Sequence, residues 1–76
     1  MDEKQKKALG KQLKIARVWL NLRGIDVAAE TGISVKQLRN IETNGSTGSV
    51  AKYLLFLRKQ GADLNKLFDA ILNSDF

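Results

Sequence analysis

Residues 24–43 read GIDVAAETGISVKQLRNIET, and this stretch decides the fold. Its composition predicts two short helices, about residues 24–31 and 35–43, joined by a tight turn. Gly32 tolerates the positive φ that ends the first helix, and Ser34 is a natural N-cap for the second. The apolar positions that would fix the angle between these helices, with a small residue at the crossing, are Val27, Ala28, Ile33, Leu38 and Ile41.

The helical period continues on the N-terminal side of this stretch. A first helix is expected from about residue 2 or 3 to Leu22, starting at a capping box formed by Asp2 and Gln5. Asn21 is expected to be a left-handed C-terminal cap, after which Leu22 folds back. Spacings of four, three and four place one apolar stripe on this helix: Leu9, Leu13, Ala16 and Leu20.

Two further helices are expected on the C-terminal side, at about residues 50–60 and 64–73. Ser49 and Asp63 precede them as N-cap candidates, and residues 44–49 form the longest loop signal. No stretch alternates apolar and polar residues for long enough to predict a strand. The chain is therefore expected to be one all-α domain over residues 1–76, a compact bundle of five helices. The inward positions expected in these two helices are Val50, Tyr53, Leu54, Leu57, Leu64, Leu67, Phe68, Ile71 and Leu72.

Composition excludes many functions. The chain has 76 residues with no Cys, His or Pro, so it lacks the usual ligands of structural zinc, cannot form disulfides, and is expected to bind no metal or cofactor. The commonest general base and the cysteine nucleophile are missing too, which argues against an enzyme. No apolar run is long enough for a membrane span or a signal peptide, so we expect a cytoplasmic protein. A net charge of +5 favours a polyanionic partner, nucleic acid before a membrane surface.

The pattern resembles the helix-turn-helix of the Cro and phage-repressor family, also called the xenobiotic-response-element type, from Leu9 to Phe68. The residues that carry the likeness are Leu9-Gly10, Arg17, Gly32-Ile33-Ser34 and Ile41-Glu42-Thr43-Asn44-Gly45. The resemblance implies a lambda-repressor-like DNA-binding domain with a helix-turn-helix. It also implies an ion pair between Arg17 on the first helix and Glu42 on the third, a structural contact for which Lys is a poor substitute.

Members of that family dock the third helix in the DNA major groove. Carried over by position, the base-reading residues become Val35, Lys36 and Asn40, with Gln37 and Arg39 next in line. Lys36 can donate to guanine O6 and N7, and Asn40 matches adenine N6 and N7. Val35 can pack on a thymine methyl group. The alternative is that these polar side chains form only a solvated helix face.

Phosphate contacts in the family come from the start of the second helix and from the segment after the third. The corresponding candidates here are Arg23, Gly24, Thr43, Asn44, Ser46, Thr47 and Lys52. Gly24 departs from the family, which has Gln at this position, and the charge of Arg23 is expected to compensate. Ordinary turn chemistry is the alternative for the other candidates.

Two surfaces are left over from this reading. One basic face of the first helix is solvated or flanks DNA: Lys4, Lys7, Lys11 and Lys14. The second is apolar and either packs within the monomer or forms a surface for a second copy: Ile15, Val18, Trp19, Ile71, Leu72 and Phe76. We expect a homodimer through the C-terminal helix and the loop before it, because one short helix reads too few base pairs.

The sequence thus predicts a small bacterial or phage transcriptional regulator, a repressor that binds double-stranded DNA at a palindromic operator. The alternative is a protein-binding module, such as the antitoxin of a toxin-antitoxin pair, whose first or last helix engages a toxin partner. A membrane-surface peptide is disfavoured because the basic and apolar residues are needed for a compact bundle.

Overall fold

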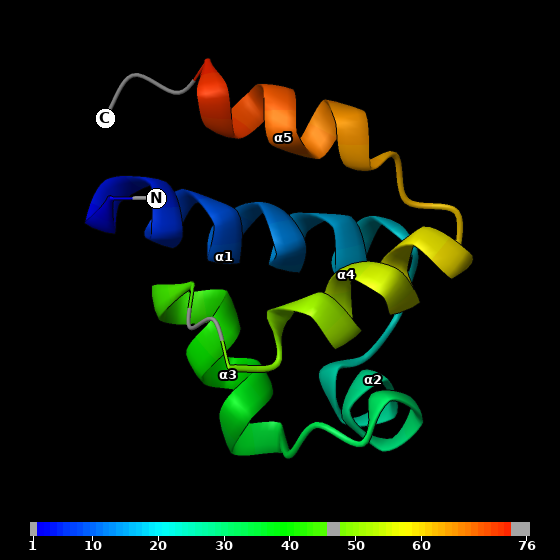
Figure 1. Ribbon diagram of the computed structural model, residues 1–76. Helices are drawn as coiled ribbons and strands as arrows, with labels where there is room; N and C mark the ends of the chain where they lie inside the picture. Colours follow the sequence, from blue (N-terminus) through cyan, green and yellow to red (C-terminus); the bar gives the residue numbers. More distant parts are fainter. Residues whose placement is uncertain (1, 46–47, 74–76) are drawn as a thin grey trace.

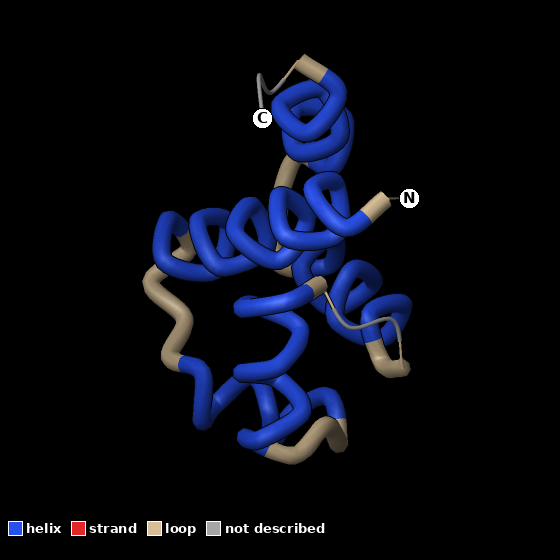
Figure 2. The backbone as a smooth tube through the Cα atoms, turned by 90° about the vertical axis from the view of Figure 1, so that its left-hand side faces the viewer, coloured by secondary structure: helices blue, strands red, loops and turns tan. Residues whose placement is uncertain are grey.

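Five helices and no strand make up the residues that the computed structural model describes, 2–45 and 48–73 (Figure 1). They are α1 (Glu3–Trp19), α2 (Gly24–Thr31), α3 (Val35–Asn44), α4 (Val50–Lys59) and α5 (Leu64–Leu72). The longest helix, α1, lies in the middle, with α5 on one side and α2, α3 and α4 on the other (Figures 1 and 2). The expected all-α, five-helix arrangement is confirmed for this part of the chain.

The start of α1 is capped as its sequence predicts. The backbone N–H of Gln5 donates to Oδ1 of Asp2 at 2.7 Å, and the N–H of Asp2 donates to Oε1 of Gln5 at 3.2 Å. The predicted end of α1 is wrong by three residues, because the helix ends at Trp19 rather than at Leu22. Asn21 takes the left-handed conformation (φ 58°), and Leu22 turns back to donate to the carbonyl of Arg17 at 3.1 Å. The predicted cap is therefore correct, and the cap itself sets the earlier end.

The turn between α2 and α3 follows the expected chemistry. Gly32 adopts φ 75° at the end of α2, and its N–H donates to the carbonyl of Ala28 at 3.0 Å. Ser34 caps α3 by accepting from the N–H of Gln37 at 3.1 Å. The amide oxygen of Gln37 in turn accepts from the N–H of Ser34 at 3.3 Å. A complete capping box therefore fixes the start of α3, of which only the Ser34 half was predicted.

The two remaining N-caps behave differently from each other. Asp63 accepts from the N–H of Lys66 at 3.1 Å and so caps α5 as predicted. Ser49 occupies the N-cap position of α4, but its side chain makes no capping hydrogen bond. Its backbone (φ −131°, ψ 18°) is not in the extended conformation of the three side-chain caps of this chain, so the predicted contact is absent.

One apolar core joins all five helices. Its buried members are Ala8, Leu9, Leu13, Val27, Ala28, Ile33, Leu38, Ile41, Tyr53, Leu57, Leu67 and Ile71. Among the other positions expected to face inward, Ala16, Leu20, Val50, Leu54 and Leu64 are only partly buried against this core. Phe68 and Leu72 keep 38% and 71% of their surface exposed. The buried face of α5 is therefore narrower than the spacing of its apolar residues predicted.

Close backbone contacts hold α3 against α1. A Cβ atom at Gly10 would overlap the carbonyl oxygen of Ile41 and would lie 2.9 Å from that of Glu42. A Cβ atom at Gly45, the left-handed cap of α3 (φ 66°), would overlap the carbonyl of Lys6. Because glycine allows both approaches, the C-terminal half of α3 and its cap lie directly against the N-terminal half of α1.

Candidate nucleic-acid interface

The helix α3 divides cleanly into a buried face and an exposed face. Leu38 and Ile41 are 2% and 1% exposed and point into the core. The residues that the sequence singled out for base contacts are all exposed: Val35, Lys36, Gln37, Arg39 and Asn40. The structure therefore presents these five side chains on one helix, turned away from the core.

The exposed side chains of α3 differ in how far they are already engaged. None of the ion pairs found within residues 2–45 and 48–73 involves Lys36 or Arg39. Arg39 borders a shallow hollow of about 380 Å³, together with Val35 and Gly24 at the start of α2. Gln37 is different, because its amide oxygen already accepts one hydrogen bond in the capping box, whereas its amide nitrogen has two donors for a ligand.

Arg23, the phosphate candidate at the start of α2, is already engaged within the chain. Arg23 is the N-cap residue, but its side chain makes no capping hydrogen bond. Instead its guanidinium binds both carboxylate oxygens of Asp26, at 2.8 and 3.3 Å, in an exposed pair. This hydrogen bond raises the pKa of Arg23, so the side chain stays charged. Asp26 is a partner of Arg23 that the sequence analysis missed. A phosphate would have to compete with Asp26 for the guanidinium.

The remaining phosphate candidates are spread over two helices. Thr43 and Asn44 are exposed in the last turn of α3, which ends one residue later than expected, so that Asn44 lies within the helix rather than after it. Lys52 is exposed in the first turn of α4. Ser46 and Thr47 lie outside the described residues.

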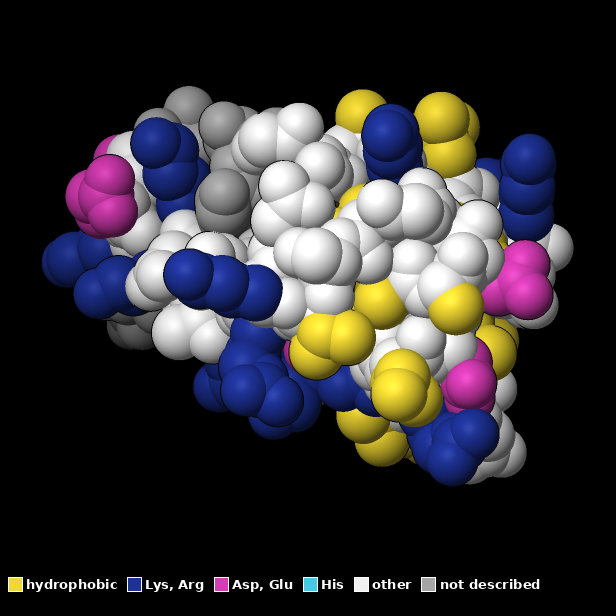
Figure 3. Space-filling view, turned by 90° about the horizontal axis from the view of Figure 1, so that it is seen from below, with side chains coloured by type: hydrophobic (Ala, Val, Ile, Leu, Met, Phe, Trp, Pro, Cys, Tyr) yellow, Lys and Arg dark blue, Asp and Glu magenta, His cyan; other side chains and the backbone are white. Residues whose placement is uncertain are grey.

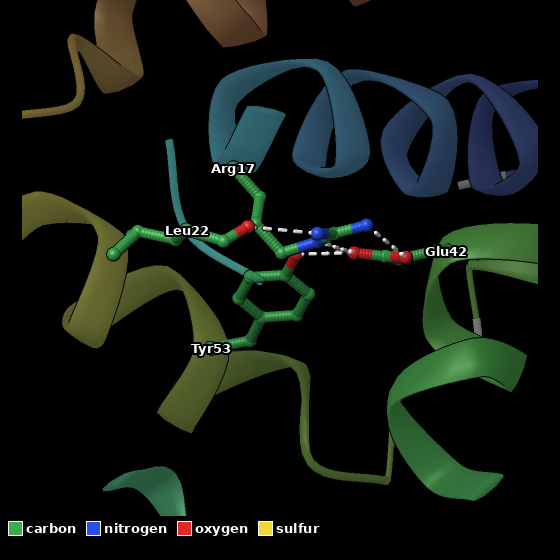
Figure 4. Close-up of polar contacts among 4 residues, drawn as sticks. All are labelled: Arg17, Leu22, Glu42 and Tyr53. Atoms are coloured by element: carbon green, nitrogen blue, oxygen red, sulfur yellow. Dashed lines mark hydrogen bonds and ion pairs between the residues drawn. The ribbon is translucent and has the colours of Figure 1, made fainter. Parts of the chain in front are cut away.

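A polar cluster behind α3 connects it to α1 and α4 (Figure 4). Arg17 donates to both carboxylate oxygens of Glu42, from Nε at 2.7 Å and from Nη2 at 3.3 Å. This is the ion pair that the resemblance implied. Arg17 also donates to the carbonyl of Leu22 at 2.8 Å, and Tyr53 on α4 donates its hydroxyl proton to Oε2 of Glu42. Three helices therefore meet at one carboxylate, and the connection after α1 is joined to them through the guanidinium of Arg17.

Tyr53 was predicted only as a core residue, and its hydroxyl contact was missed. A buried tyrosine hydroxyl usually has a hydrogen-bond partner, so the prediction that Tyr53 faces inward already implied one. Burial, and then the hydrogen bond to Glu42, raise the pKa of Tyr53 well above its usual value. The hydrogen bond to Glu42 likewise raises the pKa of Arg17. At neutral pH the tyrosine therefore remains a donor and the guanidinium remains charged.

The lower side of the molecule, where α2 and α3 lie in Figure 1, carries both cationic and apolar side chains. In Figure 3 Lys and Arg side chains lie at the left, along the lower edge and at the upper right, and hydrophobic side chains lie at the top, the centre and the right. The four lysines of the predicted basic face of α1 are also exposed: Lys4, Lys7, Lys11 and Lys14. Polyanions would therefore meet cationic side chains both beside α3 and along α1.

Other types of site find little support in the described residues. No group of three or more Asp, Glu, His or Cys side chains is placed there to hold a metal ion. None of the described helices combines the length and the apolar character that a membrane crossing requires. Comparisons of the chain with models of protein families, with curated proteins and with solved structures give no significant match.

Proposed function

We propose that this protein binds double-stranded DNA in a sequence-specific manner and acts as a transcriptional regulator. In this proposal α2 and α3 form a helix-turn-helix, and α3 is the recognition helix in the major groove. The observation that carries the proposal is the exposed polar face of α3 on a helix whose opposite face is fully buried.

The chemistry of that face suits base edges. Lys36 offers donors to the two acceptors of guanine, and Asn40 offers a paired donor and acceptor to adenine. Val35, which is 42% exposed at the start of α3, can cover a thymine methyl group. Arg39 and the amide nitrogen of Gln37 are additional donors. A helix face that is only exposed to solvent would not require this mixture of donors, an acceptor and an apolar group, although it would be compatible with it.

Affinity would come from phosphate contacts that carry no sequence information. The net charge of +5 supplies the long-range attraction, and exposed cations such as Arg23 and Lys52 can replace counterions at the backbone. Thr43 and Asn44 can add neutral hydrogen bonds from the last turn of α3. The resulting complex should weaken steeply with added salt.

The proposed functional unit is a homodimer that represses by occupying a palindromic operator. Phe68 and Leu72 lie four residues apart on α5, and both are exposed, so they offer an apolar surface to a second copy. Phe76, the other candidate for this contact, lies outside the described residues. Sedimentation should reveal a dimer that weakens when Leu72 is changed to Glu, and a monomer at high concentration on DNA would contradict this part.

The proposal is tested by selecting bound sequences from a random duplex pool at low salt. An enriched palindromic site is expected. On that site Lys36→Ala or Asn40→Ala should reduce affinity roughly 5- to 150-fold and relax the sequence preference. Lys66→Ala is the matched control for charge, because Lys66 is on α5, on the far side of α1 from α3 (Figure 1). Failure to enrich any site, or equal effects of Lys36→Ala and Lys66→Ala, would reject sequence-specific binding through α3.

A further inference from the structure

A hollow of about 380 Å³ lies between the start of α2 and the exposed face of α3, and we call it the α2–α3 hollow. Gly24 and Ile25 line it from α2, and Val35 and Arg39 line it from α3. Val35 and Arg39 also belong to the face that is proposed to read bases. The α2–α3 hollow is therefore continuous with that face.

Exposed apolar side chains from both helices border the α2–α3 hollow. Ile25, in the first turn of α2, is 62% exposed, and Val35, in the first turn of α3, is 42% exposed. The sequence analysis considered Val35 but not Ile25. Apolar groups stabilise a complex when binding removes them from water. An apolar group of a ligand that entered the hollow would cover both side chains at once.

Gly24 keeps the α2–α3 hollow open. It is not among the glycines with a positive φ, so the backbone at this position does not require glycine. A Cβ atom there would lie 3.5 Å from Cδ2 of Leu38 and 3.9 Å from Cζ of Arg17, which are ordinary contacts with two other residues that line the hollow. A larger side chain at this position would therefore occupy space that is now free for a ligand.

Most of the charged groups that line the α2–α3 hollow already have partners. Nε of Arg17 lies 2.7 Å from Oε2 of Glu42, and this pair is largely buried. Arg39 is in none of the ion pairs found within residues 2–45 and 48–73. The hollow thus combines one available cation with two exposed apolar side chains, so an apolar group next to a base edge suits it better than a phosphate does.

The major groove of DNA offers one apolar group at its base edges, the methyl group at C5 of thymine. A methylated cytosine carries the same group on the same atom. We propose that Ile25 is a specificity-determining residue, which together with Val35 holds the C5-methyl group of a pyrimidine in the α2–α3 hollow. This inference rests on the proposed function, because it requires α3 to lie in the major groove. It adds a base contact from α2 and a preference for a methyl group at one position of the bound site.

The test measures how much each pyrimidine methyl group of the selected site contributes to affinity. Fluorescence anisotropy compares duplexes that differ in one methyl group only, thymine against uracil and 5-methylcytosine against cytosine. At one position the methylated base should bind roughly fourfold tighter, as expected for burying one carbon group. The pair of bases that shows this gain identifies which pyrimidine supplies the methyl group.

Variants assign the gain to the α2–α3 hollow. Ile25→Ala should remove most of it, and Gly24→Leu should abolish it by filling the hollow. Leu55→Ala is the matched control and should keep the full gain, because Leu55 is 65% exposed on α4 and does not line the hollow. The gain is a ratio measured within each variant, so a change in the folded fraction does not alter it.

Three results would overturn this inference and leave the proposed DNA binding intact. One is an enriched site in which no methyl group changes the affinity. Another is an Ile25→Ala protein that keeps the full gain. The third is an Ile25→Ala protein that binds selected and random duplexes more weakly by the same factor, because this indicates a contact with the sugar-phosphate backbone. If no site is enriched at all, the proposed function fails and this inference fails with it.

Discussion

Replacing Glu42 with Ala should be among the most damaging single changes in this protein. The carboxylate accepts two hydrogen bonds from Arg17 and one from Tyr53, so its removal disconnects α3 from α1 and α4 at once. It also leaves the guanidinium of Arg17 without a counter-charge, although the bond to the carbonyl of Leu22 remains.

The size of the effect follows from burial. The side chains of Arg17 and Glu42 are only 13% and 10% exposed, so solvent screens the pair weakly. Removing one partner of a buried pair costs about 3–5 kcal/mol, whereas exposed pairs contribute about 0.2–1 kcal/mol. Because the pair is slightly exposed and Arg17 keeps its hydrogen bond to Leu22, we expect a loss at the lower end of the range for buried pairs, about 3 kcal/mol. For a domain of this size that corresponds to roughly 12–24 °C in Tm.

Urea unfolding followed by circular dichroism measures this loss. Glu30→Ala is the matched control, because Glu30 is an exposed helical glutamate and its replacement should change the free energy of unfolding by less than about 0.5 kcal/mol. Arg17→Ala and the double variant complete a cycle in which the two losses should not add. A loss below about 1 kcal/mol for Glu42→Ala, or full additivity in the cycle, would refute the view that this pair holds α3 in place.

Three other changes test separate parts of the argument. Tyr53→Phe should cost about 1.5–3 kcal/mol at neutral pH, because a hydrogen bond to a charged acceptor is lost. Folding raises the pKa of Tyr53, so the contribution of its protonated hydroxyl to the free energy of unfolding is complete below pH 10 and falls above it, by up to about 1.4 kcal/mol per pH unit. In urea unfolding the Phe variant should therefore lose less stability above pH 10 than the unmodified protein does. Gly10→Ala should destabilise by about 1–3 kcal/mol in thermal unfolding despite the better helix propensity of Ala, because its Cβ meets the backbone of α3; Gly48→Ala, with open space around it, is the control. If Arg23 contacts phosphate, Asp26→Asn should free it and tighten DNA binding several-fold in fluorescence anisotropy, and an unchanged affinity would exclude that role.

Local chemistry made much of the fold predictable. The capping oxygens of Asp2, Ser34 and Asp63 each bind a backbone N–H three residues ahead, so the relevant partners lie within one turn of sequence. Asn21 is similar, because its left-handed conformation depends on its own side chain and its neighbours. Ser49 shows the limit of this reasoning: the residue type was suitable, but the backbone that reaches it has the wrong torsion angles.

Contacts between distant segments were harder to predict. The bond from Tyr53 to Glu42 depends on how α4 crosses α3, which no local pattern specifies. The exposure of Trp19, the last residue of α1, depends on how the start of α5 lies against the end of α1. By contrast, Arg23 and Asp26 stand three residues apart at a helix start, so their pairing was readable from sequence.

The way α3 is held bears directly on the proposed recognition. Gly10 allows the backbones of α1 and α3 to touch, Gly45 seats the end of α3 on α1, and Glu42 ties the helix to α1 and α4. A helix fixed in this way keeps its exposed side chains at constant positions relative to the rest of the protein. Little conformational entropy is therefore lost when a ligand binds. If the proposed recognition holds, Glu42 affects DNA affinity without touching DNA: a folded Glu42→Ala protein would keep every exposed side chain of α3 but hold them less firmly. Its loss of affinity should be largest for the preferred site and small for random duplex, because only base readout depends on those positions.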